Sequence, residues 1–163
     1  MRKLEYETPD PLCFEDFEEG MCLGPVEKGP MMVGHQVRWA GACDNYHHEF
    51  HHDEYVAKAQ GLPGILLSGP LMASMLLTET TRWLGVFARV SRYVDRNVAN
   101  TMPRDAATVR GVVKRKFEEE GKALVEIECW IENQDGVKTT TGTVAAELPR
   151  RVEIAGRRAG SLA

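Results

Sequence analysis

Residues 68–84 carry the clearest hydrophobic pattern in the chain, with apolar side chains on nearly every side of a predicted helix. Ser68 stands where a helix N-cap is expected, and Pro70 falls in the first turn, where proline is tolerated. A helix that is apolar nearly all round is normally enclosed by other elements of the fold. We therefore expect this helix to be buried and wrapped by the rest of the chain.

Four segments after this helix alternate apolar and polar residues or are rich in β-branched residues, as strands are: 89–98, 107–117, 123–133 and 137–148. Turn-forming residues separate them, and those at 134–136 are typical of a hairpin. The pattern predicts an antiparallel meander of four strands. Residues 22–26 are expected to add a first strand, followed by short helices at 33–43 and 53–60, the second capped by Asp53.

A sheet that curls around one central apolar helix is the hot-dog arrangement, which is an α+β fold. The 163 residues suffice for a single domain, which we place at residues 1–149, with Phe14 and Phe17 pinning its start. Residues 150–163 hold four arginines and several small residues. We expect them to form a flexible, solvated tail.

Composition excludes several classes of partner. The net charge of −4 argues against nucleic acid, which would require a basic face. The apolar runs are too short to cross a bilayer, and no apolar stretch follows the basic first residues, so no signal peptide is expected. The four cysteines are scattered without a CxxC pair, so we expect reduced thiols, two of them in the core, in a cytoplasmic protein.

Residues 44–53 contain four of the five histidines, and histidine is the side chain that titrates near neutrality. H-E-F-H-H at 48–52 spells the HExxH motif of zinc proteases. That motif needs both histidines on one helix and a third ligand downstream, but this segment is short and no histidine follows it. A zinc hydrolase is therefore a remote alternative, and a proton-transfer site is the favoured hypothesis.

Several segments resemble the MaoC-like hydratases and dehydratases, which act on acyl-CoA or acyl-carrier thioesters. F-H-H-D-E-Y-V-A at 50–57 is similar to the family's I-H-x-D-x-x-Y-A, and I-L-L-S-G-P-L at 65–71 resembles its I-x-x-H-G-x-L. Residues 93–105 resemble the strand closed by P-x-P-G-D, and residues 133–136 resemble the last hairpin. The resemblance covers about residues 14–149. Through His48, His51 and the G-P-L at 69–71, it is closer to the branch of mesaconyl-CoA hydratase and the mitochondrial-type thioester dehydratases.

The resemblance implies reversible addition of water to an α,β-unsaturated thioester, with His51 as the base. The backbone N–H of Gly69, at the start of the long helix, would then stabilise the thioester oxygen as enolate charge develops. Either Asp44 or His48 is expected to partner His51, and both alternatives stay open.

Two positions depart from the family pattern. Tyr46 stands where the family has a catalytic aspartate, and Ser68 stands where it has a histidine before the helix glycine. Both are further candidates for contact with the substrate. The departures also support an alternative function, a non-catalytic hot-dog subunit of a heteromeric acyl-CoA hydratase. The resemblance implies no metal or redox cofactor, and a homodimer or a heterodimer of hot-dog chains.

Overall fold

The computed structural model describes residues 11–43 and 48–154. In chain order its elements are η1 (Phe14–Asp16), β1 (Cys22–Pro30), α1 (Val33–Cys43), η2 (Glu49–His51), α2 (Glu54–Ala59), α3 (Gly69–Leu84), β2 (Arg89–Asn97), β3 (Ala106–Glu119), β4 (Lys122–Glu132) and β5 (Lys138–Glu147). The predicted helices and strands are all present, with ends that differ by a few residues. No helix in these two ranges is long and apolar enough to cross a membrane.

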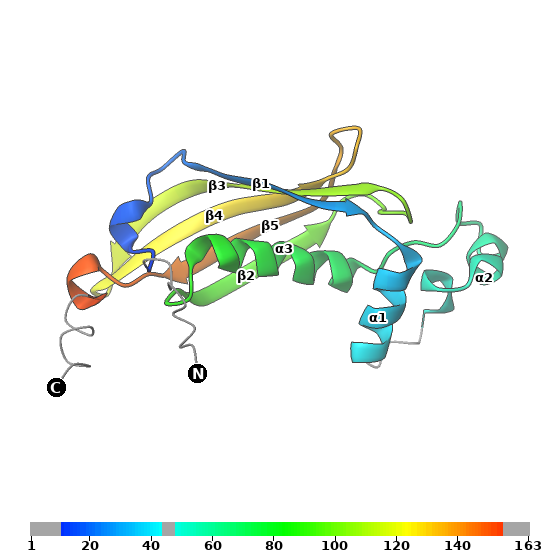
Figure 1. Ribbon diagram of the computed structural model, residues 1–163, viewed down its shortest axis with the longest axis horizontal. Coiled ribbons are helices and arrows are strands. Elements are labelled where there is room, and N and C mark those ends of the chain that lie inside the picture. The colour runs from blue at the N-terminus through cyan, green and yellow to red at the C-terminus, as the bar shows by residue number, and fades with distance from the viewer. Residues whose placement is uncertain (1–10, 44–47, 155–163) are drawn as a thin grey trace, which may run out of the picture.

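The five strands form one antiparallel sheet in the order β1-β3-β4-β5-β2 (Figure 1). The predicted meander is therefore wrong for its first strand, because β2 pairs with β5 and β3 lies between β1 and β4. The connection at 98–105 does not turn back as a hairpin. Its Thr101 carbonyl accepts the Leu67 N–H at 2.9 Å, and its Asp105 carbonyl accepts the Met31 N–H at 2.7 Å. These long-range hydrogen bonds hold the connection in place between β2, at one edge of the sheet, and β3, which lies next to β1.

Helix α3 lies along one face of the sheet (Figure 1). Its sheet-facing side chains recur at every fourth residue and are buried: Met72, Leu76, Thr80 and Leu84. They belong to one core together with the inward side chains of the strands, such as Val109, Ile127 and Val144. Full burial of each large apolar side chain contributes about 1.5–3 kcal/mol. The hot-dog prediction is confirmed, but the sheet encloses only one side of α3, and Leu71 and Met75 on its outer side stay partly exposed.

Helices α1 and α2 and the turn η2 lie beyond one end of the sheet, next to the start of α3 (Figure 1). Asp53 caps α2 as predicted, since its Oδ1 accepts the N–H groups of Tyr55 and Val56 at 2.9 and 3.1 Å. The histidine-rich turn η2, which directly precedes α2, lies next to the N-terminus of α3 (Figure 1).

The two ends of the described chain meet. Phe14 and Phe17 are buried as predicted, and the Arg151 guanidinium pairs with the Asp16 carboxylate. Ile154 is only 7% exposed. Arg151, Val152 and Glu153 are exposed, while Arg150 is half-buried and Ile154 is buried. Residues 155–163 lie outside the described residues, so the flexible tail stays a prediction.

Candidate active site

His51 ends the turn η2 and lies against the segment that leads into α3. Its Nδ1 is 2.7 Å from the carbonyl oxygen of Leu66. A carbonyl can only accept a hydrogen bond, so Nδ1 carries the proton and Nε2 of the neutral ring keeps a free lone pair. The Phe50 ring packs against the imidazole, with centroids 4.3 Å apart. The tautomer and the ring orientation are thus both set, and Nε2 has the character of a base.

Burial lowers the pKa of His51 below its ordinary value of 6.5. The hydrogen bond to Leu66 acts in the opposite direction, and the nearby His48 and His52 lower the pKa further. The imidazole is therefore neutral at pH 7. A neutral ring is the form that a general base requires.

His51 and Gly69 share one cavity of about 150 Å³, which Asn97, Ala99 and Thr101 also line. The cavity lies at the N-terminus of the sixteen-residue helix α3, where the helix dipole favours negative charge. The Gly69 N–H has no hydrogen-bond partner within residues 11–43 and 48–154. The structure therefore brings His51 and Gly69 to the same small space, and their roles as base and hydrogen-bond donor stay predictions.

Gly69 is packed too closely for a side chain. A Cβ there would lie 3.1 Å from Cγ of Asn97 and closer still to its Nδ2. The Asn97 amide is held in place because the hydroxyl of buried Thr140 donates to its Oδ1 at 2.9 Å. Its NH₂ group is thereby turned toward Gly69 and the cavity, and it supplies a second hydrogen-bond donor there.

Ser68 occupies the N-cap position of α3, but its side chain makes no capping bond. Instead, its backbone N–H donates to Oε1 of Gln36, a fully buried side chain on α1, at 2.9 Å. Ser68 Oγ and Gln36 Nε2 are buried without a partner in the part of the chain that the structure describes. A buried amide from α1 therefore anchors the start of α3 where a serine cap was expected.

The other predicted site residues have different outcomes. The ring centroids of His48 and His51 are 5.9 Å apart in an edge-on arrangement, and no hydrogen bond joins them in the described structure. Asp44 and Tyr46 lie outside the described residues, so their roles stay predictions. His52 is half-buried, and its Nδ1 has no partner in the described ranges.

The HExxH hypothesis lacks the local structure it needs. Residues 49–51 form a single 3-10 turn, and His52 has φ −143° and ψ −7°, so His48 and His52 do not lie one turn apart on an α-helix. Among the described residues, no three His, Cys, Asp or Glu side chains come together around a common point.

Three groups at the site could not be found from sequence patterns. The Leu66 carbonyl is a backbone group, Asn97 lies 46 residues from His51, and Gln36 lies 32 residues from Ser68. The only sequence indication of Asn97 and Gln36 is a polar residue in an otherwise ordinary strand or helix pattern, and the Leu66 carbonyl has none. Their contacts arise from the packing of α1, β2 and α3.

No family model matches the chain, and no curated protein matches it in sequence. Solved structures do match its fold. The ChsH1-ChsH2 complex from Mycobacterium tuberculosis contains a chain that is 21% identical, with 80% of this chain and 98% of that chain covered and a TM-score of 0.71. The MaoC-like dehydratase from Rhodospirillum rubrum is 20% identical, with 86% and 98% covered and a TM-score of 0.74.

The R-hydratase PhaJ1 from Pseudomonas aeruginosa is 15% identical, with 86% of this chain and 88% of that chain covered and a TM-score of 0.75. At these identities the likeness concerns the fold. This chain has the hot-dog fold found in R-hydratases and MaoC-like dehydratases.

Proposed function

We propose that this protein is a hydro-lyase of the MaoC-like type, which hydrates an α,β-unsaturated acyl thioester or dehydrates the corresponding 3-hydroxyacyl thioester. The observation that carries the proposal is the shared cavity of His51 and Gly69, which a neutral imidazole and the backbone of a helix N-terminus line together. The fold likeness to R-hydratases and MaoC-like dehydratases supports the same class.

In the hydration direction, Nε2 of His51 takes a proton from water as the water oxygen bonds to the β-carbon. The electron pair of the double bond moves toward the thioester, and the Gly69 N–H stabilises the negative charge on the carbonyl oxygen. A proton then goes to the α-carbon, and dehydration is the reverse of these steps. Water and the thioester are the only reactants, so no metal or redox cofactor enters the proposal.

The finer assignments rest on the sequence resemblance. We place the enzyme in the mesaconyl-CoA hydratase and mitochondrial-type branch, with acyl-CoA or an acyl-carrier thioester as substrate. Because the Leu66 carbonyl already holds Nδ1 of His51, the second group, Asp44 or His48, is proposed to exchange the α-carbon proton. Tyr46 is proposed to contact the substrate. Ser68, also a candidate from the sequence, is fully buried and does not line the His51 cavity, so no contact is proposed for it.

We propose that the working unit is a dimer of hot-dog chains. A cavity of about 150 Å³ is small beside the roughly 300–1,000 Å³ of most ligand sites, so one chain supplies only part of the site. Strands β1 and β2 each have a single neighbour in the sheet and leave an open edge. Val94 on β2 is 50% exposed. A stable monomer in light scattering after size exclusion would contradict this arrangement.

The experiment that tests the function is hydration of a panel of enoyl-CoA thioesters, followed by loss of absorbance of the conjugated thioester. His51→Ala should lower kcat by about 10²–10⁴-fold with little change in substrate binding, because it removes the base and leaves the core intact. His52→Ala is the matched control and should stay within several-fold of wild type. Failure of the wild type to hydrate any chain length, or full activity of His51→Ala, would contradict the proposal.

A non-catalytic hot-dog subunit is the second candidate. Tyr46 and Ser68 replace two family residues. The buried hydroxyl of Ser68 lacks a partner in the described ranges. One structural neighbour comes from a complex named for two chains. Activity that appears only on co-expression with a second hot-dog chain, and that survives His51→Ala, would favour this candidate over the enzyme.

A further inference from the structure

A second cavity of about 480 Å³ lies between α1, β1 and the outer side of α3. Its lining includes Leu71 and Met75, which alternate along α3 with the Gly69 and Met72 that line the His51 cavity. The two cavities therefore both border the central helix without sharing a residue, and the second extends along it as far as Arg82. This volume falls within the range of sites that hold small molecules.

One side of the second cavity is apolar. Met31 is 1% exposed at its wall, and Leu71, Met75 and the Trp39 ring complete a surface that water solvates poorly. An apolar ligand body would gain roughly 25 cal/mol for each Å² that it removes from water there.

The lining of the cavity also contains basic side chains. Lys28, Arg38 and Arg82 line it together with a single carboxylate, Glu79, so the lining carries an excess of two positive charges. Arg38 forms no ion pair with any residue in the described ranges. Lys28 is partly desolvated, with 26% of its side chain exposed, whereas Arg38 and Arg82 are exposed to solvent. Their like charges together favour an anion at the cavity.

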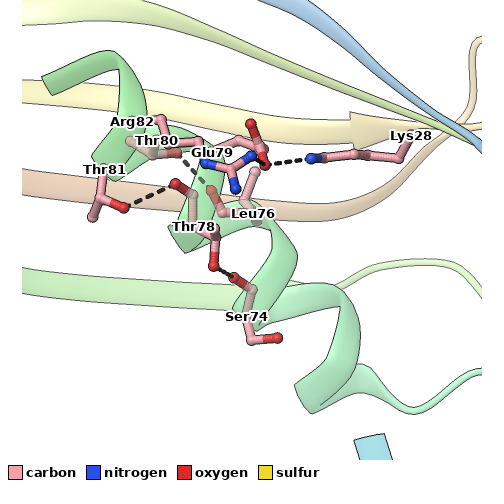
Figure 2. A network of polar contacts seen from close by, with 8 residues as sticks. All are labelled: Lys28, Ser74, Leu76, Thr78, Glu79, Thr80, Thr81 and Arg82. Carbon is pink, nitrogen blue, oxygen red and sulfur yellow. Dashed lines mark hydrogen bonds and ion pairs between the residues drawn. The ribbon is translucent and has the colours of Figure 1, made fainter. Parts of the chain in front are cut away.

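Glu79 organises these cations. It is only 3% exposed although it is charged, and the Lys28 ammonium and the Arg82 guanidinium both contact its Oε1, the latter at 2.7 Å (Figure 2). Arg82 makes this contact through one nitrogen, so the guanidinium and the ammonium keep further N–H groups for a ligand. Glu79 thus holds two cations at the cavity without using all their donors.

His35 adds an uncharged donor. Its Nδ1 accepts the backbone N–H of Met32 at 3.0 Å, so in the neutral ring the proton is on Nε2. His35 also lines the cavity.

We propose that this cavity is a binding site for a small amphiphilic anion, a molecule with one carboxylate or similar head and an apolar body. The head contacts Arg38, Lys28 and Arg82, and the body lies on Met31 and Met75. The site is separate from the His51 cavity, and its existence does not depend on the hydro-lyase activity.

The test is isothermal titration of the full chain with octanoate and, in parallel, with octylammonium, which has the same tail and the opposite charge. Octanoate should bind at least about tenfold more tightly. Arg38→Gln should weaken octanoate binding by about 5–10-fold, whereas Arg115→Gln, an arginine on β3 outside the lining, should leave it unchanged. Met75→Trp fills the cavity and should abolish binding.

Ala99→Trp fills the His51 cavity instead and should leave octanoate binding unchanged. If thermal unfolding shows that Met75→Trp does not fold, Thr78→Trp, at an exposed lining position, takes its place. Three results would each overturn the proposal: no octanoate binding, equal binding of octylammonium, or binding that Ala99→Trp removes and the cavity-filling variants on α3 retain.

Discussion

Gly69→Ala perturbs the helix start where the candidate active site is most tightly packed. The new methyl group would meet the Asn97 amide, with Cγ at 3.1 Å and Nδ2 closer. The amide must then move away from Thr140, whose hydroxyl donates to it at 2.9 Å and whose side chain is fully buried. Leaving a buried hydroxyl without its partner costs about 1–3 kcal/mol, whereas replacing glycine by alanine in a helix returns about 0.5–1 kcal/mol. The expected net loss of stability is about 0.5–2 kcal/mol.

A double-mutant cycle isolates this contact. Asn97→Ala removes the amide, so Gly69→Ala in that background should be neutral or slightly stabilising, and the coupling between the two positions should be about 1–3 kcal/mol. Urea unfolding followed by the fluorescence of the three tryptophans measures each free energy. Gly34→Ala in α1 is the matched control, because a Cβ there meets nothing within 4 Å. If Gly69→Ala costs the same with and without Asn97, the packing argument is wrong.

Two further predictions concern charge. The acid limb of the pH profile of kcat/KM should have its midpoint below 6.5, because burial lowers the pKa of His51 and the base works only when unprotonated; a midpoint above 6.5 would contradict this assignment. The same shift makes the unfolded state bind the proton first, so the stability from neutral His51 is present above pH 6.5 and is lost as pH falls toward the folded pKa. Glu79→Ala should destabilise by about 1–3 kcal/mol in urea unfolding, because it leaves Lys28, whose side chain is 26% exposed, without its counterion. Glu54→Ala, which breaks an exposed pair with Lys58, should cost less than about 0.5 kcal/mol, and equal costs would show that burial of Glu79 is not what matters.

Local patterns were sufficient for the secondary structure. The helix expected at 68–84 is observed at Gly69–Leu84, because a run of apolar residues after a proline in the first turn is a local feature of the chain. The α2 cap at Asp53 is observed for the same reason. Ser68 is the N-cap residue as expected, but its hydroxyl makes no capping bond. Its backbone N–H donates to buried Gln36, which the packing of α1 brings in.

The candidate site was predictable in part. His51 and Gly69 were expected to lie together, and the structure places both at one cavity. The partner of His51 was sought among Asp44 and His48, yet Nδ1 contacts the backbone carbonyl of Leu66. A search of side-chain types cannot identify a backbone acceptor, since every residue carries one.

The sequence by itself determined the kinds of element, their order and the hot-dog class, since hydrophobic period and turn residues act over a few neighbouring positions. Only the tertiary structure decided that β2 joins β5, that Asn97 closes over Gly69 and that Lys28 pairs with Glu79 beside a cavity. These contacts join residues far apart in the chain. The stability of these contacts depends on how whole helices and strands pack together, and a local sequence pattern does not predict that packing.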